Sequence, residues 1–246
     1  MSEDRLPGRD MFQDSIMFDS SDEEAPGLSA AAPPTQPLKI DWLNMSFMDC
    51  PQSVALSGLP GCRFRNIWQN LARDLDGKLT FQGGKNSSSH ILQDSASHLW
   101  NKIEYFGITD VVMLMTKGEL RKYRVPNLMN EYEMRGLTVH HFPFLDGTAP
   151  PVETVVDIID LVRQALEAKR KILIHCIGGL GRACVIASCL LQYFNNSLTP
   201  DQTICHIRDL RGARAVQTVK QYNFIQEFRA LFEAWMDEDI DRSVSR

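Results

Sequence analysis

Residues 170–194 contain a cysteine and an arginine whose spacing could perform chemistry on a bound anion. Cys176 and Arg182 stand six positions apart, with glycines at 178, 179 and 181 between them. Glycines let a loop curl and bring its N–H groups close to a ligand, and an arginine can grip two oxygens of a tetrahedral oxyanion. The positive field of such a loop would favour the thiolate of Cys176. A thiolate that faces a bound phosphate is a nucleophile for phosphoryl transfer.

The segments on either side of this loop are those that an anion cradle needs. The apolar run over 172–174 predicts a buried parallel strand, and 184–194 predict an apolar helix. A phosphate would then lie at the N-terminus of that helix, where the helix dipole favours an anion. The alternative is a buried cysteine in an ordinary turn between a strand and a helix. We predict a phosphate-binding loop made of Ile177, Gly178, Gly179, Leu180, Gly181 and Arg182.

Phosphoryl transfer to a cysteine also requires an acid that protonates the leaving oxygen. Asp146 is the best candidate, because it lies in a loop after a predicted strand over 138–142 and thirty residues before Cys176. That separation leaves room for one helix and one strand. Asp146 would therefore lie at the C-terminal edge of the sheet, where the sites of α/β proteins collect. On spacing alone, a helix N-cap or a turn aspartate is an equal alternative.

Strands that alternate with helices along the chain predict an α/β fold. We expect residues 116–126 to be a basic surface segment, and Arg208, Arg211 and Arg214 to form a solvated face, with contact to a phosphoprotein as the alternative. The predicted strands are 40–47 (an edge strand), 111–115, 138–142 and 172–174. The predicted helices are 64–75, 99–106, 127–135, 152–169, 184–194, 199–211 and 217–235.

The length of 246 residues allows one domain with tails. Charged residues mixed with Ala, Pro and Ser predict a disordered N-terminal tail over 1–39. We expect the domain to occupy 40–236, with a flexible loop at about 76–97 and a C-terminal tail over 237–246.

Composition excludes several classes of protein. The net charge of −5 and a pI near 5.7 argue against general binding of nucleic acid. No apolar run approaches the roughly 20 residues of a membrane span, and we see no signal peptide. The six cysteines show no paired metal spacing, and Cys184 and Cys189 fit core packing. We therefore expect a reducing setting, in the cytosol or the nucleus.

Several segments resemble the kinase-associated phosphatases, also called cyclin-dependent kinase inhibitor 3, a family of cysteine-dependent dual-specificity protein phosphatases. The matching strings are 18–24, 118–127, 175–182, 208–212 and 217–223. The resemblance implies a dual-specificity phosphatase-like α/β fold, with a central, mostly parallel sheet and helices on both faces. It implies Cys176 as nucleophile, Arg182 as phosphate clamp and Asp146 as general acid, with no metal or cofactor.

The same resemblance implies what the protein acts on. The expected substrate is the activation-loop phosphothreonine of a cyclin-dependent kinase, and that phosphorylated kinase is the expected partner. We expect a monomer that occurs in the cytoplasm and the nucleus, with a perinuclear location as a further alternative. Ile177 and Leu180 argue against a lipid or polyphosphate phosphatase, which would be expected to carry lysines in this loop.

The sequence departs from the family pattern at two places. The loop at 76–97 is longer than in the family. Ala183 replaces a hydroxyl residue that usually follows the arginine and that hydrogen-bonds the cysteine sulfur. Without that hydroxyl, the thiolate that leaves the phosphocysteine is less stabilised. The alternative to an active phosphatase is therefore a weakly active or inactive module that binds phosphoproteins or kinases.

Overall fold

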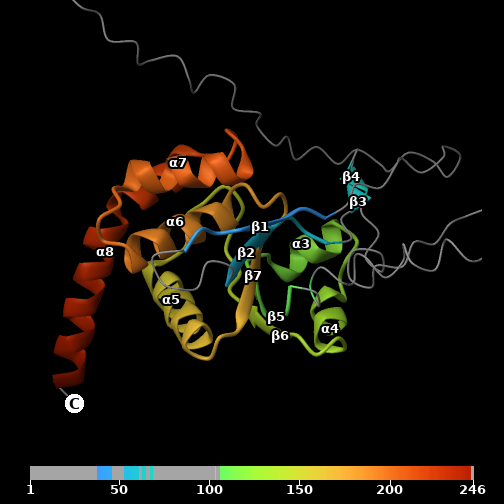
Figure 1. The fold of residues 1–246 in the computed structure, drawn as a ribbon, viewed down its shortest axis with the longest axis horizontal. Helices are drawn as coiled ribbons and strands as arrows, with labels where there is room; N and C mark the ends of the chain where they lie inside the picture. The colour runs from blue at the N-terminus through green and yellow to red at the C-terminus, as the bar shows by residue number, and fades with distance from the viewer. Residues whose placement is uncertain are drawn as a thin grey trace, which may run out of the picture. The chain divides into compact units, whose positions relative to one another are not determined.

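The structure is a computed structural model that describes residues 38–45, 53–60, 63–64, 67–68, 103 and 106–244. The predicted loop at 76–97 and nearly all of the predicted tail over 1–39 lie outside these residues. The described part has the predicted α/β fold (Figure 1). Its strands are β1 (Ile40–Trp42), β2 (Val54–Ser57), β3 (Arg63–Phe64), β4 (Ile67–Trp68), β5 (Ile108–Met113), β6 (Thr138–His141) and β7 (Lys171–His175). Its helices are α3 (Lys117–Lys122), α4 (Leu128–Glu133), α5 (Val152–Glu167), α6 (Arg182–Phe194), α7 (Pro200–Arg211) and α8 (Val219–Val244).

Five strands form the central sheet in the order β1-β2-β7-β5-β6. β2, β7, β5 and β6 pair in parallel, and β1 pairs antiparallel with β2 at the edge. The mostly parallel sheet and the edge strand are therefore confirmed. β2 was not predicted, because only three apolar residues mark it and its neighbour β7 lies more than a hundred residues further along the chain.

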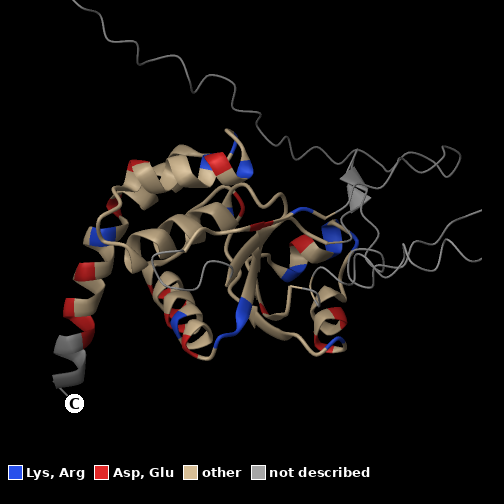
Figure 2. Ribbon diagram, viewed as in Figure 1, with Lys and Arg blue, Asp and Glu red and all other residues tan. Residues whose placement is uncertain are grey.

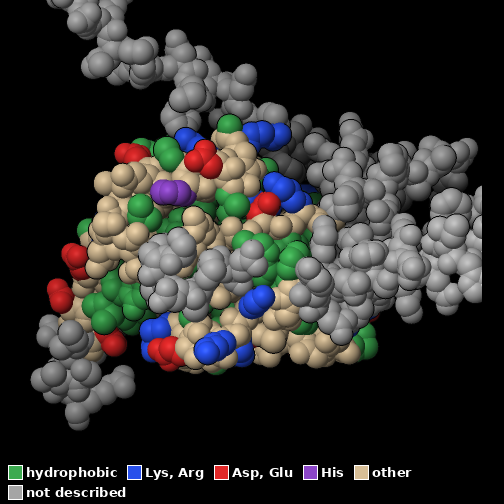
Figure 3. Space-filling view, viewed as in Figure 1, with side chains coloured by type: hydrophobic (Ala, Val, Ile, Leu, Met, Phe, Trp, Pro, Cys, Tyr) green, Lys and Arg blue, Asp and Glu red, His purple; other side chains and the backbone are tan. Residues whose placement is uncertain are grey.

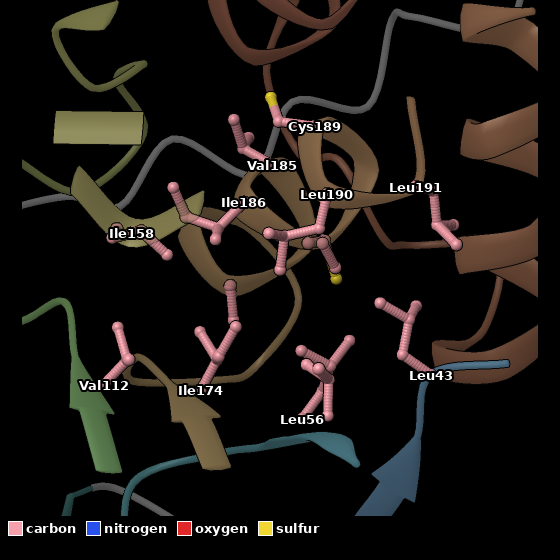
Figure 4. Packing of buried hydrophobic residues seen from close by; sticks show 14 of the residues in the cluster. Leu43, Leu56, Val112, Ile158, Ile174, Val185, Ile186, Cys189, Leu190 and Leu191 are labelled. Carbon is pink, nitrogen blue, oxygen red and sulfur yellow. The ribbon is translucent and has the colours of Figure 1, made fainter. Parts of the chain in front are cut away.

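Helices cover both faces of this sheet, with α5 and α6 on one side and α3 and α4 on the other (Figure 1). Because side chains alternate across a strand, the strands β2, β5 and β7 contribute to two cores. In the first core, the strands meet α6 through the buried residues Leu56, Val112, Ile174, Val185, Ile186 and Leu190 (Figure 4). The second core joins the sheet to α3 and α4 through Val111, Met113, Leu173, Leu120 and Tyr132.

Three predicted elements differ from the structure. The helix predicted over 64–75 is wrong where residues are described, since β3 and β4 form a hairpin in which Phe64 faces Ile67. Residues 116–126 contain α3, which a capping box of Thr116 and Glu119 begins. The last helix continues through the predicted tail to Val244, because no glycine or proline interrupts 236–244.

No helix among the described residues has the length and apolar character required to span a membrane. On the face shown in Figure 3, basic, acidic and apolar side chains are interspersed.

Candidate active site

The C-terminal ends of the parallel strands meet at one edge of the sheet, where ligands of α/β proteins usually bind. Cys176 follows the central strand β7, and Thr116 lies in the connection after β5. Asp146 lies in the loop after β6, and Gly58 follows β2. The spacing argument that placed Asp146 at the same edge as Cys176 is therefore confirmed as a matter of position.

The loop over 177–181 directs its carbonyl oxygens outward. Four consecutive carbonyls accept hydrogen bonds from outside the loop: Ile177 from Leu59 N–H (2.8 Å), Gly178 and Gly179 from the Arg211 guanidinium (3.5 and 3.0 Å), and Leu180 from Val216 N–H (2.9 Å). In a trans peptide unit, the C=O of one residue and the N–H of the next point in opposite directions. The N–H groups of 178–181 therefore face the enclosed side of the loop, where they form a cradle for an anion.

Close packing from behind holds the loop in this shape. Gly179 has a φ of +66°, and a Cβ there would lie 2.4 Å from Arg211 Nη2 and 2.5 Å from Ser57 O. A Cβ on Gly181 would lie 2.8 Å from Gln217 Oε1. α6 begins directly after Gly181 without a side-chain cap, so its first N–H groups are also available to an anion.

Arg182 is fully buried and is fixed by a carboxylate that the sequence analysis missed. Glu119 accepts hydrogen bonds from Arg182 Nη1 (2.9 Å) and Nη2 (2.7 Å). The Arg182 Nη1 group also donates to the carbonyls of Leu114 (3.1 Å) and Phe144 (2.9 Å). Burial would lower the pKa of Arg182, but its hydrogen bonds to Glu119 and its electrostatic interactions with the neighbouring acidic groups raise it. The guanidinium therefore stays charged inside the protein.

Glu119 is itself oriented by the start of α3. Its Oε2 accepts hydrogen bonds from the Thr116 N–H (2.8 Å) and hydroxyl (3.0 Å). Burial would raise the pKa of Glu119, but the hydrogen bonds from Arg182 and Thr116 outweigh burial and lower it. The string Thr116-x-x-Glu119 after a predicted strand is a capping-box signature, so the sequence contained a signal for this helix start that the sequence analysis did not use. Nothing in the sequence marked Glu119 as the partner of Arg182.

One edge of the Arg182 guanidinium carries donors that are not hydrogen-bonded within the described part of the chain. Its buried Nε has no hydrogen-bond partner in the described part of the chain, and Nη2 spends one N–H on Glu119. The Nε–H and the second Nη2–H lie on the same edge, which is the fork that grips two oxygens of an oxyanion. Asp146 Oδ1 lies 3.2 Å from Nε as an ion pair without hydrogen-bond geometry. The structure thus brings the predicted residues Arg182 and Asp146 together.

The described cysteines of this region have different surroundings. Cys184 and Cys189 are fully buried in α6, as predicted for core residues. Burial raises the pKa of Cys184 to about 12 and also raises that of Cys189, so both remain thiols. Cys176 is 2% exposed and directly precedes the loop over 177–181. Of these three sulfurs, Cys176 is the one placed to meet a bound anion.

His175, directly before Cys176, is held neutral. It is fully buried, its Nε2 lies 3.2 Å from the Tyr132 hydroxyl, and burial lowers its pKa to about 4. A neutral imidazole packs in the core behind the loop without adding a second positive charge.

The prediction of a solvated basic face is wrong for Arg211. Basic residues do gather in the last turn of α7 (Figure 2). The Arg211 side chain, however, is only 6% exposed and lies behind the loop over 177–181, paired with Asp41. Arg208 Nε donates to the Ala215 carbonyl (3.3 Å), and Arg214 is exposed. Sequence reasoning could not separate these three arginines, because all follow the same helical and turn pattern.

Comparison with known proteins gives consistent matches over most of the chain. The family model for cyclin-dependent kinase inhibitor 3 matches residues 10–87 and 88–204. Cyclin-dependent kinase inhibitor 3 of Rattus norvegicus is 38% identical over 231 residues, which cover 93% of this chain and 95% of the relative. The Homo sapiens protein of the same name matches with the same identity and coverage.

Solved structures extend this similarity to the fold. A crystal structure of kinase associated phosphatase, in which serine replaces the catalytic-site cysteine, matches with a TM-score of 0.68 and 37% identity. That match covers 82% of this chain and 99% of the other. The active form of Tk-PTP matches with a TM-score of 0.51 and 25% identity, over 72% of this chain and 92% of the other.

Proposed function

Because this chain belongs to the cyclin-dependent kinase inhibitor 3 family, we propose that it hydrolyses phosphothreonine in the activation loop of a cyclin-dependent kinase. The family and the similar solved phosphatases support a cysteine-dependent protein phosphatase with dual specificity, which also accepts phosphoserine and phosphotyrosine. Removal of the activating phosphate would restrain the cell cycle.

One arrangement carries the proposal: the N–H groups of 178–181 face the enclosed side of the loop, and Arg182, which follows them, has an Nε without a hydrogen bond among the described residues. A phosphate there would accept hydrogen bonds from these amides and from Arg182 Nε and Nη2. It would satisfy a buried donor that has no hydrogen-bond partner among the described residues. Those contacts stabilise charge on the equatorial oxygens as the reaction proceeds.

The first chemical step transfers the phosphoryl group to the enzyme. The Cys176 thiolate attacks phosphorus, an S–P bond forms, and the bond between phosphorus and the threonine oxygen breaks. Asp146, 44% exposed and next to Arg182, donates its proton to that leaving oxygen. The products are the kinase with an unphosphorylated threonine and an enzyme with a phosphocysteine.

The second step restores the enzyme. A water attacks phosphorus while Asp146, now a carboxylate, accepts the proton of that water. The S–P bond breaks, inorganic phosphate leaves, and Cys176 returns to a thiolate. The fully buried methyl of Ala183 offers the departing sulfur no hydrogen bond. This favours the second candidate function, a weakly active or inactive module that binds a phosphorylated kinase.

Phosphate release from a threonine-phosphorylated cyclin-dependent kinase distinguishes the two functions. We expect release by the wild type, none by Cys176→Ser, and retained binding of the phosphorylated kinase by Cys176→Ser. Acid quenching of a reaction with labelled phosphate should trap a phosphoenzyme in the wild type. Binding without release by the wild type would leave the binding module as the function.

A further inference from the structure

A short segment directly before α8, residues 216–218, is hydrogen-bonded to the two loops of the candidate active site. Its Val216 N–H donates to the Leu180 carbonyl of the phosphate-binding loop (2.9 Å). Two residues later, the Thr218 hydroxyl donates to the Gly147 carbonyl (2.8 Å), in the loop that carries Asp146. Residues 216–218 therefore connect the phosphate-binding loop to the acid-bearing loop.

The hydroxyl of Thr218 has a defined direction. It accepts the Gln221 N–H (3.2 Å), so its single proton is free to point at Gly147 O. Gln221 is fully buried and is fixed in turn, since its Oε1 accepts the Gln217 N–H (2.9 Å). Val216 adopts a φ of +63°, which a β-branched residue adopts only when its surroundings impose it. Residues 216–218 are therefore held in place without a bound substrate.

Before Asp146, the acid-bearing loop is held by the bond from Arg182 Nη1 to Phe144 O; after Asp146, its hydrogen bonds to the rest of the protein come from Thr218 and Gln221. Residues 145–148 form a tight turn in which the Thr148 N–H (3.2 Å) and hydroxyl (2.7 Å) both donate to Leu145 O. Those bonds fix the shape of the turn but not its direction over the cradle. The bond from Thr218 to Gly147 O, with a weaker one from Gln221 Nε2 to Thr148 O (3.5 Å), ties the turn to the rest of the protein.

We propose that Thr218 is a positioning residue for the general acid: its hydroxyl holds the 145–148 turn so that Asp146 faces the oxygen leaving the bound phosphate. This inference rests on the proposed function, because it assumes that Asp146 donates the proton. Thr218 does not touch the reacting atoms. It acts through one carbonyl, one residue away from the acid.

The test compares aryl phosphates with good and poor leaving groups. A poor leaving group needs the proton and a good one does not, so loss of acid positioning steepens the dependence of kcat/KM on the leaving-group pKa. For Thr218→Val we expect kcat/KM for phenyl phosphate to fall about tenfold, which is the loss that removal of one hydrogen bond produces. For a dinitrophenyl phosphate, kcat/KM should fall less than about twofold. Inhibition by inorganic phosphate should not change. Thr218→Ser, which keeps the hydroxyl, should restore the wild-type dependence.

A double-mutant cycle with Asp146→Asn shows whether Thr218 acts through the acid. In the Asp146→Asn background, Thr218→Val should cause no further loss. Equal losses for all leaving groups, or a further loss in that background, would overturn the proposal. Thr218→Ala replaces Thr218→Val if melting shows that the valine variant does not fold. If Asp146→Asn itself leaves the dependence flat, Asp146 is not the acid and the role of Thr218 falls with it. A steep dependence for Asp146→Asn beside a flat one for both Thr218 variants refutes Thr218 alone.

Discussion

Asp41 on β1 and Arg211 at the end of α7 form an ion pair directly behind the loop over 177–181, with Nη1 and Oδ2 2.5 Å apart. The same guanidinium donates to the carbonyls of Gly178 and Gly179. The pair therefore links the edge strand β1 to the back of the anion cradle. Because Arg211 is 6% and Asp41 14% exposed, removal of the carboxylate leaves a nearly buried charge unpaired.

We predict that Asp41→Asn lowers the free energy of unfolding by about 2–3 kcal/mol and also lowers kcat/KM. Urea unfolding and aryl phosphate turnover measure the two effects. Lys39→Ala is the matched control, since Lys39 contacts the same carboxylate (3.1 Å) from a position that is 68% exposed. Its effect on unfolding should stay below about 1 kcal/mol. Similar small effects for both variants would show that the ion pair does not support the loop.

Glu119 should matter for catalysis although it touches no substrate. In Glu119→Gln, one oxygen can still accept from Arg182, but the amide NH2 faces the second guanidinium nitrogen. We expect kcat/KM for aryl phosphates to fall by roughly 10- to 100-fold, because the phosphate clamp loses its orientation and a charged partner. Glu131→Gln, which removes the charge of a carboxylate on α4 from its ion pair with Arg135, should change kcat/KM less than about twofold. Unchanged inhibition by vanadate in Glu119→Gln would contradict this role.

Ala183→Ser should raise turnover. A serine hydroxyl there would hydrogen-bond the Cys176 sulfur and stabilise the thiolate as it leaves phosphocysteine. Such a charge-assisted bond is worth about 1.5–3 kcal/mol, or roughly ten- to a hundredfold in the rate of the second step. Rapid-quench kinetics should show a burst of product in the wild type that shrinks in the variant. Equal turnover by the two proteins would refute this role of residue 183.

The contrast between Cys176 and Glu119 shows which parts of the site the sequence could predict. The strand, loop and helix around Cys176 are contiguous in sequence, so apolar runs and glycines were sufficient to predict them. Asp146 could be placed because one helix and one strand separate it from that loop. Glu119 and Arg211 meet the site from 63 and 32 residues away in sequence, through side-chain contacts that no local pattern records.

At β3 and β4 the local pattern predicted the wrong element, a helix in place of two strands. Phe64, Ile67 and Trp68 have the three- and four-residue spacing of a helix, yet the same spacing suits two short antiparallel strands. Periodicity over so few residues cannot choose between them.

His175 should make the stability of the protein depend on pH. Burial lowers the pKa of its imidazole to about 4 from an ordinary value of 6.5. Between these values the unfolded chain binds a proton that the folded protein does not, so the contribution present above pH 6.5 is lost as the pH falls towards 4. At pH 5 the loss should be about 2 kcal/mol. We expect the free energy of unfolding, measured with urea, to fall between pH 7.5 and pH 5. That fall should be smaller in His175→Asn than in the wild type by about 2 kcal/mol. The same pH dependence in both proteins would mean that His175 titrates normally in the folded state.

Gly179 and Gly178 offer a matched pair of alanine substitutions in the cradle. At Gly179 the φ of +66° and the contacts of 2.4 Å to Arg211 Nη2 and 2.5 Å to Ser57 O leave no room for a methyl group. At Gly178 a methyl group would meet nothing within 4 Å. We predict that Gly179→Ala reduces kcat/KM at least about a hundredfold and lowers the free energy of unfolding by more than the roughly 1–2 kcal/mol cost of the left-handed conformation alone. Gly178→Ala keeps its N–H and should remain within about tenfold of wild type. Circular dichroism melting and aryl phosphate kinetics on both variants check this, and a Gly179→Ala enzyme as active as Gly178→Ala would show that Arg211 does not need to approach the loop for catalysis.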